Sequence, residues 1–215
     1  MYLPKHFSED RPEILKQLII ENPLASLVTV FQGIPELNHV PMILSADRKF
    51  LQCHIPKANP LYEQLHQTES QQNQQALISF QGVDAYITPK WYPTKKENGK
   101  VVPTWNYAVV HIRGTIVLKD DRVWLCEHLH ALTQQMEKTR DSDWQVSDAP
   151  QDYLDSMMNV LVGIEISIDS MAGKMKLSQN RLDKDRDAVM ENLTQSKNKI
   201  DQHMSQFAKE LKKNL

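Results

Sequence analysis

A lysine lies beside a helix-start signal in the segment HIPKANP at positions 54–60. Asn59 followed by Pro60 is typical of a helix N-cap with proline at the first helical position. The ammonium of Lys57 and the free N–H groups of the helix's first turn could converge there on a phosphate, where each charge-assisted hydrogen bond contributes about 1.5 to 3 kcal/mol. The residue types alone also allow Lys57 to be a solvated lysine beside a cap. His54 is either an ordinary strand histidine or a second contact for the same phosphate.

A second group of cations occurs later in the chain. Lys174, Lys176 and Arg181 fall within eight residues and flank the polar run 178–180. This composition suits an anion site, but it is equally typical of a surface loop that precedes a helix. The residues alone leave both interpretations open.

The glycines exclude the common phosphate-binding loops. The chain has six glycines, at positions 33, 82, 99, 114, 163 and 173, so none has a close glycine neighbour. A Walker loop and a dinucleotide fingerprint both need clustered glycines that let backbone amides approach phosphate. A phosphate in this protein must therefore be held by side-chain cations or by a helix N-terminus.

Metal-binding and nucleophilic motifs are absent from the sequence. His128 and His130 are two positions apart on a predicted helix, so their side chains point to different faces. Cys53 and Cys126 lack neighbours at zinc-site spacing. No nucleophile elbow or Ser/His/Asp order occurs. We predict no metal site and assign no catalytic residue.

Composition predicts a folded protein without a membrane segment. The chain has 215 residues, 40% of them hydrophobic, and a net charge of -2. That net charge argues against a protein surface covered with positive charge for non-specific nucleic-acid binding, but not against a local basic patch. The sequence shows no signal peptide, no run long enough to span a bilayer and few cysteines, so we expect a cytoplasmic protein.

The hydrophobic pattern predicts a mainly β chain with peripheral helices, an α+β class. A meander of short strands at this spacing favours a barrel. The expected strands are 24–30, 36–43, 49–55, 76–80, 85–88, 107–118 and 162–168. The expected helices start at Pro12, with Ser8 or Asp10 as the start signal, and at Pro60, and span 120–138, 148–160 and 185–213. The segments 68–75 and 89–105 are expected to be an exposed loop and a long irregular segment.

Four segments, taken in order, carry a family resemblance: MYLPKHF at 1–7, HIPKANP at 54–60, AYITPKWY continuing to VPTWNY at 85–107, and GKMKLSQNR at 173–181. They resemble the PaiB-type family of FMN-binding negative transcriptional regulators over roughly residues 1 to 195. The resemblance implies an FMN-binding split β-barrel related to pyridoxamine-phosphate oxidases and flavin reductases, with FMN at the interface of a homodimer. We expect the barrel over 1–180. Residues 181–215 would form a C-terminal helical arm, longer than the family pattern, packed on the barrel or on the dimer partner.

The resemblance also implies that polar and aromatic residues of these segments are candidate FMN contacts. Asn106 offers a donor and an acceptor to a flavin edge, and Trp105 and Tyr107 would lie against the ring, although loop aromatics often only pin a loop to its barrel. Trp91 is expected to pin its loop to the barrel. The candidate cofactor-binding residues are His54, Lys57, Asn59, Thr88, Trp105, Asn106, Tyr107, Lys174, Gln179 and Arg181.

Three functions remain open at this point. A flavin-binding regulator would contact DNA or a protein partner, but DNA is implied by the resemblance alone, because no helix-turn-helix pair is visible. A flavin-dependent oxidoreductase using NAD(P)H is the first alternative. A haem-binding or haem-degrading split barrel is the second, with candidate ligands His6, His39, His54 and His111.

Overall fold

The computed structural model describes residues 1–67 and 74–213. Positions 68–73 of the segment predicted as an exposed loop lie outside the described residues. The strands are β1 (Ser8–Glu9), β2 (Leu24–Phe31), β3 (Ile34–Pro41), β4 (Ile43–Leu44), β5 (Phe50–Pro56), β6 (Gln75–Ile87), β7 (Thr104–Lys119), β8 (Leu161–Ser167) and β9 (Ser170–Lys176). The α-helices are α1 (Pro12–Glu21), α2 (Pro60–Gln67), α3 (Thr94–Asn98), α4 (Arg122–Lys138), α5 (Gln151–Asn159), α6 (Asp183–Gln195) and α7 (Lys199–Lys213).

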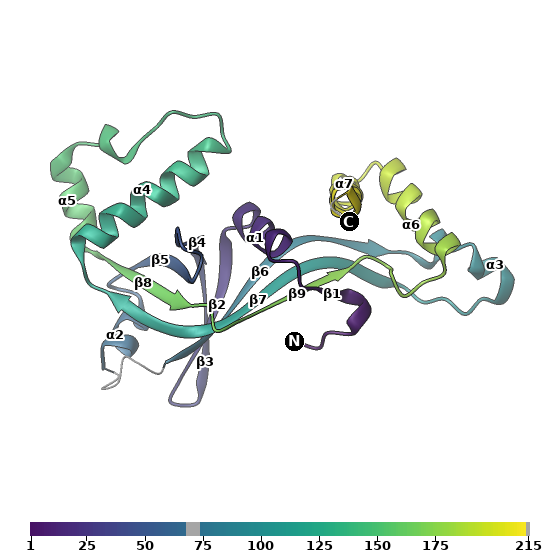
Figure 1. The fold of residues 1–215 in the computed structure, drawn as a ribbon, viewed down its shortest axis with the longest axis horizontal. Helices are drawn as coiled ribbons and strands as arrows, with labels where there is room; N and C mark the ends of the chain where they lie inside the picture. Colours follow the sequence, from purple (N-terminus) through teal and green to yellow (C-terminus); the bar gives the residue numbers. More distant parts are fainter. Residues whose placement is uncertain (68–73, 214–215) are drawn as a thin grey trace. The chain divides into compact units, whose positions relative to one another are not determined.

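The described strands form a sheet in the order β3-β2-β6-β7-β8-β5-β4, with β9 beside β7 and β1 beside β9 (Figure 1). The registered pairs are antiparallel. The chain divides into two compact units. Unit 1 comprises residues 1–22, 80–111 and 172–215, and unit 2 comprises residues 23–79 and 112–171. The predicted class, a mainly β chain with peripheral helices, is confirmed.

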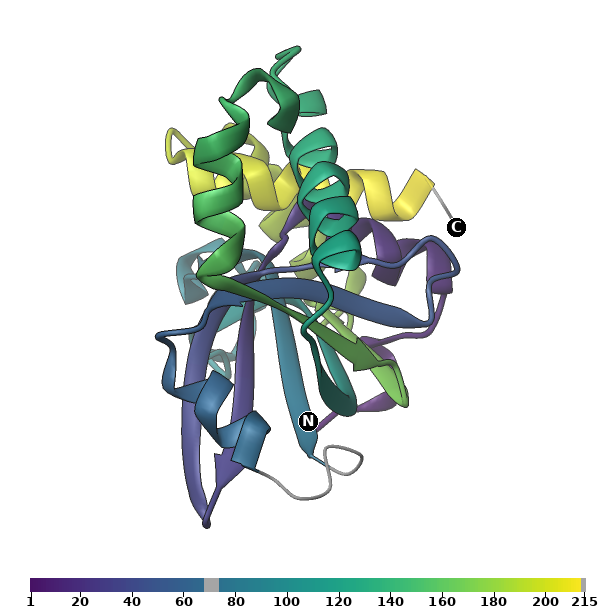
Figure 2. The same cartoon turned by 90° about the vertical axis from the view of Figure 1, so that its left-hand side faces the viewer.

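Unit 2 is built on the β2–β3 hairpin and on the pairing of β5 with β8. Inward residues of these two strands, such as Cys53 and Ile164, are fully buried and directly opposite each other. Helices α4 and α5 pack against β8 and against each other, and Figure 2 shows them as neighbouring helices. Gly114 permits a close backbone approach, because a Cβ there would come within 1.6 Å of the Ser167 carbonyl oxygen.

Unit 1 buries a core between the end of β6 and the C-terminal helices. Ala85 and Ile87 of β6 pack with Tyr92, and with Val189 and Leu193 of α6. Met204 of α7 completes the cluster. The predicted helical tail therefore contributes core residues to its own unit.

The structure corrects the predicted boundaries in unit 1. The predicted strands 76–80 and 85–88 are one continuous strand, β6, which ends at Ile87, because Gly82 does not mark a turn. A Cβ at Gly82 would lie 3.2 Å from a Leu18 methyl group and 3.4 Å from the Ala108 Cβ. The glycine thus allows α1 and β7 to pack closely on β6.

Two further corrections concern the ends of helices. Arg11 occupies the N-cap of α1, while Ser8 and Asp10, the predicted start signals, hydrogen-bond to each other. The expected single helix over 185–213 is two helices. Asn198 breaks it, because its Oδ1 accepts from the Ile200 N–H at 3.0 Å and so starts α7.

The segment around residue 174, whose composition is typical of a surface loop, is strand β9. Its pairing with β1 and β7 was not predicted from its composition. In the described residues, no helix is both long and apolar enough to cross a membrane.

Candidate functional site

Three cations gather at the end of β9 in unit 1, and we call Lys174, Lys176 and Arg181 the β9 cation group. Lys174 is buried, with 8% of its surface exposed. Its Nζ donates to the Tyr2 carbonyl at 3.0 Å and lies 5.4 Å from the centre of the Tyr107 ring. The buried Lys174 Nζ thus has an aromatic face and a neutral acceptor as partners.

Lys176 lies close enough to Lys174 and Arg181 for their charges to affect it. Its Nζ donates to the Thr104 hydroxyl and to the Trp105 carbonyl. Burial lowers the pKa of Lys176 below its ordinary value, and the charges of Lys174 and Arg181 lower it further. The three positive charges therefore repel one another at this site.

Arg181 completes the group from the turn after β9. Its guanidinium carbon lies 4.9 Å from the centre of the buried Tyr92 ring. Within residues 1–67 and 74–213, no ion pair joins Lys174, Lys176 or Arg181 to a carboxylate. This cluster of mutually repelling, uncompensated cations favours an anion as ligand.

The turn after β9 is held by buried side chains. Asn106 is 1% exposed, and its Oδ1 accepts from the Ser178 hydroxyl at 3.1 Å. Ser178 has φ +67°, a left-handed conformation that costs a non-glycine residue about 1 to 3 kcal/mol. Gln179 braces the same turn, because its Oε1 accepts from the Leu177 N–H at 2.6 Å and its amide donates to the Met175 carbonyl. The turn that carries Arg181 is thus preorganised.

An aromatic surface lies in the same unit. Tyr86 of β6 and Trp105 of β7 are 48% and 52% exposed, and their rings meet edge to face at 5.9 Å. Thr88 is at the end of β6, where its hydroxyl accepts from the Lys90 N–H at 3.3 Å and caps a short 3-10 helix. Trp91 packs against the core cluster of the unit, which confirms its predicted packing role.

The segment around Lys57 lies in unit 2. The Asn59 Oδ1 accepts from the Leu61 N–H at 2.9 Å, so the predicted N-cap of α2 is confirmed. Lys57 differs from the β9 cation group because it has a carboxylate partner, with its Nζ 3.4 Å from Asp120 Oδ1. It lines a cavity of about 200 Å³ together with Lys119 and other residues of the same unit.

His54 pairs with a histidine that sequence analysis did not place near it. Its Nδ1 lies 3.1 Å from the Nε2 of His128, which is 2% exposed and stacked on Trp124. Gly163 makes room, because a Cβ there would lie 2.3 Å from the Trp124 ring. Burial lowers the pKa of both histidines; with the added effect of the His54 charge, that of His128 falls to about 4. Both rings are therefore neutral at pH 7.

The other haem-ligand candidates also have partners. His39 contacts the Ser26 hydroxyl at 3.3 Å, and the His6 ring packs edge to face on Phe7. Within the described residues, no group of three or more His, Cys, Asp or Glu side chains is placed to hold a metal ion. Because a haem iron can be held by a single histidine, haem ligation by one of these residues stays a prediction.

Residues 1–170 match the family model described as "Putative FMN-binding domain". The chain belongs to this FMN-binding family. An uncharacterized protein of Emericella nidulans is 35% identical over 88% of this chain and 89% of its own length. Protease synthase and sporulation protein PAI 2 of Bacillus subtilis is 31% identical over 100% of both chains. The resemblance to PaiB-type proteins and the assignment of FMN as cofactor are confirmed.

Solved structures show the fold of this FMN-binding chain. The FAD and haem binding protein of Mycobacterium smegmatis has a TM-score of 0.61 at 17% identity, covering 84% of this chain and 79% of that one. Flavocytochrome Anf3 of Azotobacter vinelandii has a TM-score of 0.57 at 14% identity, covering 81% and 72%. At such identities the likeness concerns the fold alone, and it confirms the predicted split β-barrel fold.

The predicted FMN contacts fall into two sets within this family fold. Unit 1 brings Asn106, Tyr107, Lys174, Gln179 and Arg181 around β9 and its following turn, with the Trp105 carbonyl as a partner of Lys176. Unit 2 holds His54, Lys57 and Asn59. The role of both sets as cofactor contacts stays a prediction.

The list of candidate cofactor contacts left out Lys176, Ser178 and Tyr92, although Lys176 was counted among the cations of a possible anion site. The spacing of Lys174 and Lys176 was an available signal, because residues two apart on a strand share one face.

Proposed function

We propose that the β9 cation group holds the phosphate of FMN. The observation that carries this proposal is the absence of any carboxylate partner for Lys174, Lys176 and Arg181 in the described part of the chain. A phosphate dianion would supply the missing negative charge and accept from all three donors. It would also relieve the repulsion that lowers the pKa of Lys176.

The surroundings of the group suit the remaining parts of the cofactor. The exposed rings of Tyr86 and Trp105 offer an aromatic surface to the isoalloxazine. The bond from Ser178 to Asn106 keeps β7 and the turn after β9 in one fixed arrangement. When bound, FMN supplies an acceptor and donor of one or two electrons, while the side chains of this chain bind and orient it.

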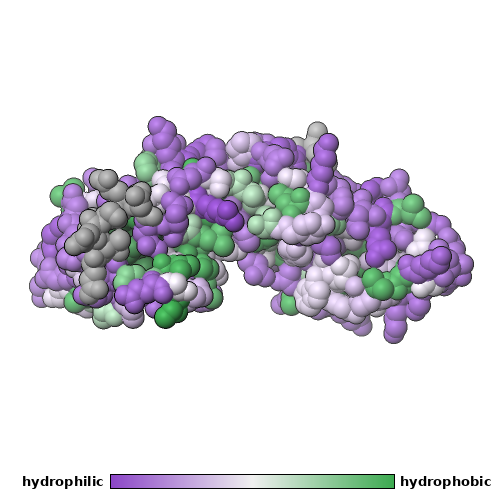
Figure 3. Space-filling model, turned by 90° about the horizontal axis from the view of Figure 1, so that it is seen from below, coloured by the Kyte–Doolittle hydropathy of each residue, from purple (hydrophilic) through white to green (hydrophobic). Residues whose placement is uncertain are grey.

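We further propose that two copies of the chain associate through the exposed face of the β2–β3 hairpin. Leu24, Val30 and Leu37 share this face and are 49% to 63% exposed, and β3 ends the strand order of the sheet. Figure 3 shows hydrophobic surface over this part of unit 2. An exposed apolar edge hairpin of this kind is a liability in a monomer, and a second copy would cover it.

The biological role that fits best is that of a cytoplasmic FMN-dependent regulator. PAI 2, which aligns with this chain from end to end, is named for protease synthesis and sporulation. We propose that FMN binding at β9 controls contact with DNA or a protein partner. The name of PAI 2 is what favours the regulator over an NAD(P)H oxidoreductase.

Flavin titration tests the proposal directly. Quenching of FMN fluorescence by the purified chain should saturate at one flavin per chain, and Lys176→Met should weaken the binding. Replacing Lys57 by alanine in the same assay separates the two candidate phosphate contacts. Loss of FMN binding in Lys57→Ala together with full binding in Lys176→Met would assign the phosphate contact to unit 2 instead. Steady oxidation of NAD(P)H by the FMN-loaded protein would favour the oxidoreductase over the regulator as the function of this chain.

A further inference from the structure

A second ligand-sized space lies within unit 1, on the other face of β9. It is a cavity of about 550 Å³ between β1, β9 and helices α6 and α7. Met175 and Leu177 form its floor, and Met190, Ala208 and Leu211 form its helical wall. Its volume falls in the range of about 300 to 1,000 Å³ that small-molecule sites occupy. The space is therefore large enough for a ligand with a substantial apolar body.

Strand periodicity separates this cavity from the β9 cation group. Lys174 and Lys176 face one side of β9, and Met175 faces the other. Glu9 is paired with Gly173 in the neighbouring strand and lines the cavity as well. A ligand here would occupy a different site from the phosphate proposed above.

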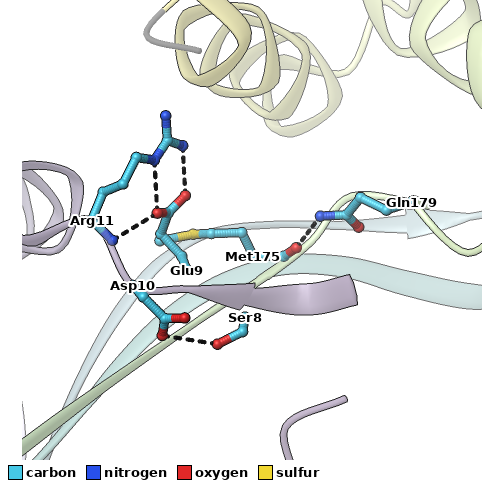
Figure 4. A network of polar contacts seen from close by, with 6 residues as sticks. All are labelled: Ser8, Glu9, Asp10, Arg11, Met175 and Gln179. Carbon is cyan, nitrogen blue, oxygen red and sulfur yellow. Dashed lines mark hydrogen bonds and ion pairs between the residues drawn. The ribbon is translucent and has the colours of Figure 1, made fainter. Parts of the chain in front are cut away.

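The charges around the cavity favour an anion. Its lining includes one carboxylate, Glu9, and three cations: Arg11, Arg186 and Lys212. The negative charge of Glu9 is already balanced, because Arg11 donates to its two oxygens at 2.8 and 2.6 Å (Figure 4). The Arg11 side chain also helps to lower the pKa of Glu9, so the carboxylate stays charged and paired. Lys212 is thus left as positive charge without a carboxylate partner among the residues that line this largely apolar cavity.

Arg186 also has an unused donor. One of its terminal nitrogens contacts Asp183 at 2.9 Å, at the exposed side of α6. Its Nε is buried and has no hydrogen-bond partner in the described residues. Buried donors of charged side chains are normally satisfied, so this N–H indicates a missing acceptor. A carboxylate placed in the cavity would supply it.

We propose that this cavity binds a monocarboxylate with an aliphatic chain, such as a medium-chain fatty acid. The carboxylate accepts from Arg186 and lies near Lys212, and the chain packs on Met175, Met190 and Leu211. The hydrocarbon body follows from the apolar lining, and the single negative charge follows from the unpaired charge of Lys212 and the unused Nε–H of Arg186. The site goes beyond flavin binding and does not depend on it.

Calorimetric titration of the full chain, with and without saturating FMN, tests the site with sodium decanoate as the probe. We expect saturable binding of one decanoate per chain in both forms. Decan-1-ol should bind at least tenfold more weakly, a difference of about 1.4 kcal/mol, because it lacks the charge. Lys212→Gln and Arg186→Gln should each weaken decanoate binding by at least fivefold. Lys209→Gln, on the same helix but outside the cavity lining, should bind like the wild type.

A further variant tests the location. Leu211→Trp places a large ring at the half-buried wall of the cavity and should abolish decanoate binding, with the thermal unfolding midpoint checked in parallel. The proposal is overturned if decanoate gives no saturable binding, or if decan-1-ol binds as tightly. It is also overturned if a folded Leu211→Trp chain binds decanoate normally, or if Lys209→Gln weakens binding as much as Lys212→Gln. Failure of flavin binding would leave the titration of the FMN-free chain unaffected.

Discussion

Replacement of Lys176 by methionine gives the sharpest test of the flavin site. Methionine keeps an unbranched chain of similar length and removes the charge. One charge-assisted hydrogen bond to phosphate is worth about 1.5 to 3 kcal/mol, so FMN binding should weaken about 10- to 150-fold. Fluorescence quenching of FMN at constant ionic strength measures this change. Lys96→Met is the matched control, because Lys96 is an exposed lysine of the same unit.

The stability of the FMN-free variant separates a ligand-binding cation from a structural one. The variant loses the contacts with Thr104 and Trp105, but it also relieves repulsion from Lys174 and Arg181. The two effects oppose each other, so the free energy of unfolding should change by less than about 1 kcal/mol. Unchanged FMN affinity, or a loss of several kcal/mol in the FMN-free chain, would refute the assignment of Lys176 to the phosphate.

The pKa of Lys176 also predicts the direction in which stability and FMN affinity change with pH. The folded FMN-free chain holds the pKa of Lys176 below its ordinary value of 10.5. Between those two values the unfolded chain binds more protons than the folded one, so the stability of the FMN-free chain should rise with pH. A bound phosphate favours the protonated lysine, so FMN affinity should fall as pH rises through the same window. Lys176→Met should remove both contributions.

Three further predictions concern other parts of the chain. Thr94→Val removes the 2.7 Å hydrogen bond from its hydroxyl to the buried Asp185 carboxylate and should cost about 1.5 to 3 kcal/mol in a urea unfolding titration; a cost below about 0.5 kcal/mol would contradict it. Leu37→Lys places a charge on the hairpin face proposed to pair two copies, and size-exclusion chromatography with light scattering should show a monomer, whereas a persistent dimer would place the interface elsewhere. The pKa of His128 is lowered to about 4, so the wild type should lose up to about 1.4 kcal/mol of stability per pH unit as pH falls from 6.5 toward 4. His128→Leu should flatten that slope in the same unfolding titration, and an unchanged slope would assign the acid sensitivity to other groups.

Local signals in the sequence were sufficient where one residue determines the backbone. Asn59 and Pro60 predicted the start of α2, because an amide cap and a fixed φ act within a single turn. Gly82 shows the limit of such reasoning. A glycine in a strand can mark a break or a close approach of other elements, and only the packing of Leu18 and Ala108 on it decides between them.

The candidate site was less accessible because it depends on contacts between distant positions. His54 and His128 are 74 residues apart, and their pairing follows from the packing of α4 on β5 and β8. Lys176 was passed over for a different reason. Its neighbours gave the segment the composition of a loop, so the strand periodicity that unites it with Lys174 was not applied.

Strand β9 connects the two ligand sites proposed for unit 1. Its alternation directs Lys174 and Lys176 to the phosphate site and Met175 to the carboxylate cavity. The Gln179 side chain lines the cavity and also fixes the turn that carries Arg181, through its bonds to the Met175 carbonyl and the Leu177 N–H. A ligand that pushed Gln179 aside would release the left-handed turn and with it one cation of the phosphate site. Such a displacement would couple occupancy of the cavity to FMN affinity, and the two ligands would then influence each other by the same factor.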